Sequence, residues 1–322
     1  MEDILRRCLG CYLPLGSVAG EFHPACSMRI FGTQDPPEFP ITLTETEQCG
    51  SKLVLAHATI PGVQPKLSLD LQPAANGHSR RFTIIGLDGH WGGYILKPQT
   101  KQYEELPENE GLTMHLAEIA SLTTATHSLM RMVSGELAYI VKRFDRVRKK
   151  DVLQKLAQED MCQLTERLTS DKYKGSLEQI GRAIQRYSSS PGFDLIRFFE
   201  LNLFCYLVGN ADMHLKNFAL LTSGGQTALS PAYDLLSTAI VLEDNEETAL
   251  ALNGKKSNLR PKDWMQFGQT MGIPNKSAED SLQNLLSKLP EMISFISISF
   301  LSKGRKEKLT AIVKSRSAVL NS

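Results

Sequence analysis

The chain contains 322 residues with a hydrophobic content of 42%, enough to bury the cores of two ordinary domains. Its 36 basic and 35 acidic residues give a formal net charge of +1, which excludes a global charge excess for direct binding of nucleic acid or of an anionic membrane. No apolar run has the length of a membrane span or the position of a secretion signal, so we expect a cytoplasmic protein, with export into another cell by a different route left open.

Cysteine and histidine recur near the N-terminus at a spacing that suits a metal site. Cys8 and Cys11 form a Cys-x2-Cys pair, and His23 and Cys26 follow as a His-x2-Cys pair. Three thiolates and one imidazole complete a tetrahedral zinc site, so residues 1–50 would form a Cys/His knuckle. The alternative is that the cysteines pack as small buried apolar residues, as in other proteins of a reducing compartment. The sequence leaves zinc and plain packing both open.

Residues 59–66 are a candidate phosphate loop. Gly62 permits a tight turn, and bare backbone amides beside it, at Val63 and Gln64, can approach phosphate oxygens. The segment has neither the Gly-x-Gly-x-x-Gly of kinases nor a Walker Lys-Ser pair, so the pattern alone fits an ordinary turn as well.

Short strands follow, with one helix among them. Apolar and β-branched runs predict strands at 67–71, 82–86, 94–97 and 137–141, and turns at 76–77, 88–89 and 134–135. A helix is expected to begin near Pro107 and to place Leu112, Leu116 and Ile119 on one face. Together these elements predict a sheet-rich lobe over residues 1–145.

Lys97 and Glu110 are the candidate nucleotide-binding pair of this lobe. Lys97 ends a predicted strand, where its ammonium could bind the α- and β-phosphates of a nucleotide, and Glu110 on the next helix could position it. The alternatives are a solvated strand end for Lys97 and an ordinary carboxylate in a first helical turn for Glu110.

Beyond residue 145 helical patterns replace strands. They predict helices at 152–168, 177–187 and 194–208, a hairpin turn at Asn253-Gly254, and further helices to the C-terminus. The helix at 194–208 is apolar on nearly every face, which predicts a buried central helix, and Gly209 suits a left-handed cap. The expected fold is therefore α+β, with a small sheet-rich lobe and a larger helical lobe, residues 146–322, that enclose a nucleotide cleft.

The polar run after the central helix carries the chemistry. Asp212 and Asn217 have the Asp-x4-Asn spacing of kinase catalytic loops, in which the acid accepts the proton of the attacking hydroxyl and the amide helps to bind magnesium. Asp234 follows a short strand at 218–221 and a Gly-Gly turn, and is the second magnesium ligand. One aspartate in one loop fits a cap, but the three residues in this order favour catalysis.

Two further residues of this run are candidates. Lys216 could neutralise charge on the transferred phosphoryl group, or it could pair with a neighbouring carboxylate. His214 is better suited to orient the loop by hydrogen bonds than to transfer protons.

Several motifs in one order resemble the HipA-like kinases, the toxins of bacterial toxin–antitoxin modules. The motifs lie at residues 62–66, 94–98, 107–110, 141–146, 158–163, 209–220 and 229–235, and the resemblance extends over 59–256. It implies a two-lobed fold related to protein kinases and dependence on ATP and Mg²⁺. It also implies that residues 141–144, including Lys142 and Phe144, contact adenine and that Gln163 lies near the nucleotide.

The resemblance is strongest to the short HipT kinases, because fewer than 60 residues precede the candidate phosphate loop. It implies an aminoacyl-tRNA synthetase as protein substrate, and antitoxin partners that include a separately encoded protein similar to the N-terminal subdomain of full-length HipA. HipT loops commonly read Ser-Ile-Ser, whereas this chain has Thr59-Ile60-Pro61, so autophosphorylation is expected at Thr59.

Two other functions stay open. Small-molecule phosphotransferases of related fold share the Asp-x4-Asn spacing and the second aspartate, and a non-catalytic pseudokinase could bind an antitoxin. The motifs at 107–110 and 158–163 favour the HipA-like interpretation over the first, and the complete set of catalytic residues weighs against the second.

Overall fold

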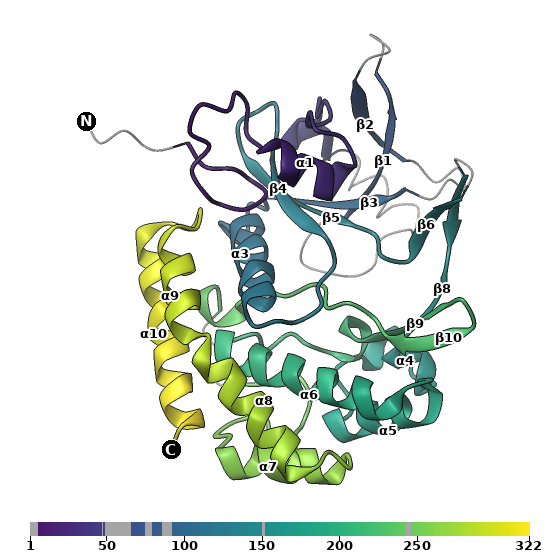
Figure 1. Ribbon diagram of the computed structural model, residues 1–322, viewed down its shortest axis with the longest axis vertical. Coiled ribbons are helices and arrows are strands. Elements are labelled where there is room, and N and C mark those ends of the chain that lie inside the picture. The colour runs from purple at the N-terminus through teal and green to yellow at the C-terminus, as the bar shows by residue number, and fades with distance from the viewer. Residues whose placement is uncertain are drawn as a thin grey trace. The chain divides into compact units, whose positions relative to one another are not determined.

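The computed structural model describes residues 6–46, 48, 66–74, 79–85, 92–149, 152–242 and 246–322 (Figure 1). The chain divides into two compact units. The first comprises Met1–Gly111, Ala125–Lys155 and Ile298–Phe300, and the second comprises Leu112–Thr124, Leu156–Ser297 and Leu301–Ser322. The candidate phosphate loop with Thr59, Gly62, Val63 and Gln64, and the predicted turns at 76–77 and 88–89, lie outside the described residues.

A five-stranded antiparallel sheet forms the first unit. Its order is β2-β1-β3-β5-β4, with β1 at Leu67–Pro73, β2 at Arg80–Ile84, β3 at Tyr94–Pro98, β4 at His127–Arg131 and β5 at Leu137–Lys142. Burial alternates along β1, so that Leu67, Leu69 and Leu71 face the core. The central strand β3 pairs Lys97 with Tyr139 of β5. The sheet therefore places Lys97 inside the unit.

The helix α1, Pro24–Phe31, lies beside this sheet (Figure 1), and aromatic side chains join the two. Phe31 packs edge to face on Phe82, with ring centroids 5.8 Å apart, and Phe82 packs in the same way on Tyr94 at 5.2 Å. Tyr94 Oη also donates to the Ile30 carbonyl at 3.0 Å. A two-stranded ribbon, β6 at Arg146–Lys149 and β7 at Val152–Lys155, completes the unit.

Helix α3, Leu106–Ile119, begins one residue before Pro107 and carries Glu110. Proline suits this position because the first N–H groups of a helix have no partner within the helix. Gly111 permits a close approach, since a Cβ there would lie 2.5 Å from Tyr12 Oη. The helix is therefore pressed against the N-terminal segment at the turn that presents Glu110.

The second unit is organised around α6, Pro191–Val208, which is buried over most of its length. Phe198 and Phe199 of this helix pack on the rings of Phe218 and Phe267. The other helices and 3-10 turns are α4 at Met161–Leu164, η1 at Thr169–Asp171, α5 at Leu177–Tyr187, η2 at Leu215–Asn217, η3 at Thr238–Ile240, α7 at Pro261–Thr270, α8 at Asn275–Ser287, α9 at Leu289–Ser297 and α10 at Lys303–Leu320. A three-stranded sheet has the order β10-β9-β8, from Gln226–Leu229, Ala219–Ser223 and Ala157–Asp160.

Most predicted elements are confirmed within a few residues. These include four strands of the first sheet, the helix at Pro107, α5, α6 and the C-terminal helices. Gly209 caps α6 with a φ of 75°, and the Asn253-Gly254 turn has φ values of 48° and 78°. Among the described residues, no helix is both long and apolar enough to cross a bilayer.

The predicted helix at 152–168 is wrong. This segment forms β7 and β8 and only then the single turn α4. β8 pairs with β9, so that Asp160 lies opposite Ala219. Local apolar spacing cannot reveal a partner strand about sixty residues away.

Two further differences concern the first unit and the domain boundary. The strand β4 was not predicted. The predicted domain division after residue 145 differs from the compact units, which assign residues 146–155 to the first and 112–124 to the second.

Candidate active site and the cysteine–histidine cluster

The loop after α6 carries the predicted acid and amide. A Cβ at Gly209 would lie 2.8 Å from the Ala239 side chain, so the left-handed turn that ends the helix requires glycine. Thr238 Oγ1 then accepts the Ala211 N–H at 2.9 Å, and the Asn210 side chain accepts the Asp212 N–H at 3.1 Å. These hydrogen bonds fix the backbone that presents Asp212.

Asp212 and Asn217 are joined within this loop. Asn217 Nδ2 donates to the Asp212 carbonyl oxygen at 2.9 Å, and the Asn217 N–H donates to the His214 carbonyl oxygen, also at 2.9 Å. The amide oxygen of Asn217 remains, and it is a ligand type that Mg²⁺ accepts. The half-buried Asp212 carboxylate accepts a hydrogen bond from Tyr173 Oη at 2.6 Å. Tyr173 was missed in the sequence, where no local pattern marks it.

Asp234 belongs to the segment after β10 and has a φ of 54°, in the left-handed region that aspartate rarely adopts. Burial lowers the pKa of His214 to about 4, although the charges of Asp212 and Asp234 act in the opposite direction. His214 is therefore neutral at pH 7, and its ring packs edge to face on Tyr173 at 5.1 Å. A hydrogen bond connects the Asp234 segment to the Asp212 loop, since Tyr233 Oη donates to the Lys216 carbonyl oxygen at 2.9 Å.

Lys216 forms an ion pair with Asp160, a residue that the sequence prediction did not include. Lys216 Nζ lies 2.6 Å from Asp160 Oδ2. Asp160 also caps α4, where its side chain accepts the Gln163 N–H at 3.0 Å and the Gln163 side chain accepts the Asp160 N–H at 2.9 Å. This Asp-x-x-Gln capping box was a readable signal for Asp160. Of the two situations predicted for Lys216, the structure contains the pair with a carboxylate, and a role in phosphoryl transfer stays a prediction.

In the first unit, Lys97 and Glu110 form the predicted pair. Lys97 Nζ lies 2.5 Å from Glu110 Oε1, and the two side chains are only 4% and 3% exposed. The ammonium also lies 5.4 Å from the centre of the Tyr139 ring, within the range of a cation–π contact. A role of either residue in binding nucleotide phosphate stays a prediction.

The residues predicted to contact adenine lie at the end of β5. Lys142 is exposed, its N–H donates to the Thr126 carbonyl oxygen at 2.8 Å, and Phe144 is half-buried. The next residue, Asp145, accepts two hydrogen bonds of 3.0 Å from the Arg143 guanidinium. This bidentate pair holds the segment that follows β5. Contact of Lys142 and Phe144 with adenine stays a prediction.

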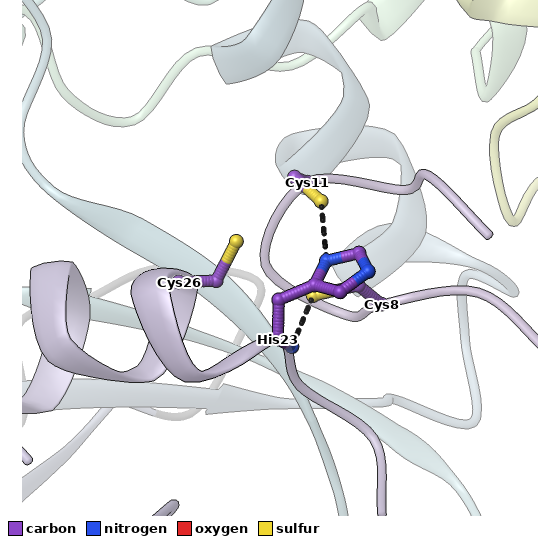
Figure 2. Close-up of side chains that lie close together, drawn as sticks. All are labelled: Cys8, Cys11, His23 and Cys26. Carbon is purple, nitrogen blue, oxygen red and sulfur yellow. Dashed lines mark hydrogen bonds between the residues drawn. The ribbon is translucent and has the colours of Figure 1, made fainter. Parts of the chain in front are cut away.

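Four side chains of the N-terminal segment converge in the first unit (Figure 2). Cys8, Cys11, His23 and Cys26 have ligand atoms that all lie within 4.8 Å of one another. Their elements explain the convergence, since Cys8 and Cys11 belong to one tight turn and Cys26 to α1, with His23 as its N-cap. We call these four residues the Cys/His cluster.

The thiols of the Cys/His cluster are electrostatically unequal. A hydrogen bond from the Cys11 thiol, with further ones from backbone N–H groups, lowers the pKa of Cys8 to about 4. The same hydrogen bond raises the pKa of Cys11, and burial raises that of Cys26. The pKa of one thiol of the cluster is therefore lowered, while the pKa values of the other two are raised.

Comparisons with known proteins agree with this fold. The family model of the HipA-like C-terminal domain matches residues 58–293. Y4dM of Sinorhizobium fredii is 32% identical over 238 residues, which make up 70% of this chain and 54% of Y4dM. The serine/threonine-protein kinase toxin HipA of Shewanella oneidensis is 25% identical over 282 residues, 81% of this chain and 60% of the toxin.

A solved complex of HipA, HipB and operator DNA from Shewanella oneidensis MR-1 contains a similar chain. The identity is 19% and the TM-score 0.68, and the match covers 88% of this chain and 74% of that one. This likeness confirms the α+β, kinase-like fold predicted from the sequence. The chain spans about half the length of Y4dM, with 54% of it covered.

Proposed function

Because the chain belongs to the HipA-like C-terminal domain family, we propose that it is an ATP-dependent serine/threonine protein kinase that acts as the toxin of a toxin–antitoxin module. The observation that carries this proposal is the loop in which Asn217 donates to the Asp212 backbone at 2.9 Å, and to which Tyr233, the residue before Asp234, is bonded through the Lys216 carbonyl oxygen at 2.9 Å. An acid, an amide and a second acid are the side chains that phosphoryl transfer needs.

Asp212 would accept the proton of the acceptor hydroxyl. Its half-buried carboxylate accepts a hydrogen bond from Tyr173 Oη, which orders it, and its partial exposure leaves it accessible. The Asn217 amide oxygen and the Asp234 carboxylate would bind Mg²⁺, which neutralises charge on the nucleotide phosphates when it is bound. Lys216, oriented by Asp160, would add positive charge for the transferred group.

ATP would be bound by groups of the first unit as well. Lys97, positioned by Glu110, would pair with the α- and β-phosphates, and backbone amides at Gly62, Val63 and Gln64 would donate to phosphate oxygens. Lys142 and Phe144 would contact adenine, with Gln163 near the nucleotide.

The substrate and partners are part of the proposal. We expect an aminoacyl-tRNA synthetase as acceptor, whose phosphorylation would inhibit translation, together with antitoxins that include a separately encoded protein similar to the N-terminal subdomain of HipA. Autophosphorylation at Thr59 would add about two negative charges to the candidate phosphate loop and inactivate the kinase. Intact mass after incubation with Mg-ATP tests this step, since one added phosphate should appear in the unmodified chain and be absent from Thr59→Ala.

Phosphoproteomics of cells that express the chain or its Asp212→Asn variant tests the function. A synthetase peptide that gains phosphate only with the unmutated chain, together with arrested growth, is the expected result. Growth arrest by both forms would favour a binding protein without catalysis, and phosphorylation of an aminoglycoside instead of protein would favour a small-molecule phosphotransferase.

A further inference from the structure

Backbone donors in the Cys/His cluster converge on one sulfur. The N–H groups of Gly10 and His23 donate to Cys8 Sγ at 3.4 and 3.3 Å. A neutral thiol is a weak acceptor, whereas a thiolate attracts several N–H donors. Burial of cysteine as a small apolar residue needs no such donors. The cluster is therefore arranged around a charged sulfur.

Gly10 lets the turn with Cys8 and Cys11 approach α1 closely. A Cβ at Gly10 would lie 3.0 Å from Cys26 Cβ and 3.0 Å from Ile30 Cδ1, too close for any larger residue without a shift. The absence of a side chain at Gly10 thus helps the two Cys/His pairs to come together.

The His23 ring has a defined orientation. Its Nδ1 lies 3.3 Å from Cys11 Sγ, and its Nε2 lies 3.1 Å from the Pro14 carbonyl oxygen. A carbonyl oxygen can only accept, so Nε2 is the donor of this hydrogen bond, and in the neutral imidazole Nδ1 then directs its lone pair toward the other ligand atoms (Figure 2). Metal-binding histidines usually donate their other ring N–H to a carbonyl or carboxylate in this way.

We propose that the Cys/His cluster is a structural zinc site, with Zn²⁺ bound by its three sulfur atoms and by Nδ1 of His23. The ligand atoms now lie within 4.8 Å of one another, and in a tetrahedral zinc site they are separated by about 3.5 to 3.8 Å. A contraction of at most about 1.3 Å would complete the coordination. Protons that remain on the thiols would pass to solvent when the metal binds. With four protein ligands the site is closed to substrate.

The site would anchor the N-terminal segment to the edge of the first sheet. Leu9 lies between the first two ligands, and its carbonyl oxygen accepts the Leu129 N–H at 3.3 Å and the Ser128 hydroxyl at 3.1 Å, both from the edge strand β4. Covering an edge strand in this way protects it from pairing with other chains. Zinc would therefore support the fold of the first unit and take no part in phosphoryl transfer.

Elemental mass spectrometry of the full chain, purified under reducing conditions without added metal, tests the proposal by measuring the bound zinc. One zinc ion per chain is expected, with loss of at least nine tenths of it in Cys26→Ser. Cys205→Ser is the matched control, because Cys205 is a buried cysteine of α6 outside the cluster and should leave the zinc content unchanged.

Titration with Co²⁺ tests metal binding by the Cys/His cluster without any substitution. Chelator-treated, reduced chain titrated with Co²⁺ should develop thiolate-to-metal charge-transfer bands and tetrahedral d–d bands that saturate at one equivalent. A chain that binds neither zinc nor cobalt, or that is isolated folded with a Cys8–Cys11 disulfide, would overturn the proposal. Neither measurement depends on kinase activity, so failure of the zinc proposal would leave the proposed kinase function untouched.

Discussion

The two units place their candidate catalytic charges in opposite environments. In the first, Lys97 and Glu110 are almost fully buried and paired at 2.5 Å. In the second, Asp212 is half-buried, and its backbone is fixed by Asn210 and Asn217. A buried pair keeps its geometry because neither partner can be left alone in the interior, whereas a partly exposed acid on a fixed loop can reach a ligand. Substitutions of the buried pair should therefore change both ligand binding and stability, whereas substitution of Asp212 should change the reaction rate without changing stability.

The largest expected effect is on the reaction rate of the Asp212→Asn variant, with little change in the stability of the second unit. Asp212→Asn should lower the rate of phosphotransfer about a thousandfold, because an amide cannot accept the hydroxyl proton. The melting temperature should stay within about 2 °C of that of the unmutated chain, since the backbone hydrogen bonds of the loop remain. Calorimetry beside a steady-state assay measures both. A large fall in melting temperature would show that the loop depends on the carboxylate for its fold.

The opposite outcome is expected for the buried pair. Glu110→Gln leaves the Lys97 ammonium buried without its counter-charge and should reduce the free energy of unfolding by about 3 kcal/mol, besides weakening ATP binding. Denaturant unfolding measures the first effect and nucleotide titration the second. Glu104→Gln, at an exposed carboxylate before the same helix, is the matched control and should change neither. An unchanged stability for Glu110→Gln would refute the contrast between the units.

A pH profile sharpens the description of the second unit. Burial lowers the pKa of His214 from 6.5 to about 4, so between these values the unfolded chain binds more protons than the folded one. Stability from this group is present above pH 6.5 and is lost as the pH falls toward 4, by about 3 kcal/mol. Unfolding of the protein without added Mg²⁺ at several pH values should show this loss of stability, and His214→Gln should remove the part of the pH dependence that comes from His214. An equal slope in both proteins would mean that other groups cause it.

The smallest effect concerns Lys216 and Asp160. If Asp160 acts only by orienting Lys216, Lys216→Gln should lower the transfer rate about tenfold, Asp160→Asn about threefold, and the double variant no further than Lys216→Gln alone. Losses that add independently, or an Asp160→Asn loss as large as that of Lys216→Gln, would assign the pair a structural role instead.

The sequence predicted those parts of the fold that depend on local signals. The buried helix α6 and its Gly209 cap followed from apolar residues on every face and a glycine at the end. The spacing of Cys8, Cys11, His23 and Cys26 predicted a cluster, and the structure brings all four together.

Features that depend on distant partners could not be predicted in this way. The strand β8 is defined by its pairing with β9, because its own four residues include only one apolar side chain and alternate between exposed and half-buried positions. Tyr173 contacts Asp212 from 39 residues away, through the packing of the second unit. For Asp160 a capping box was present, but its ion pair with Lys216 spans 56 residues.

The most direct test of the central claim is transfer of the γ-phosphate by the purified chain. The chain, γ-labelled ATP, Mg²⁺ and a bacterial lysate treated to remove endogenous nucleotide should yield acid-stable label on protein serine or threonine. Asp234→Asn should abolish this label, because Asp234 would bind the metal, while Lys276→Gln, at an exposed ion pair with Asp280 on α8, should leave it unchanged. Label that persists undiminished in Asp234→Asn, or no label on protein with the unmutated chain, would contradict the account.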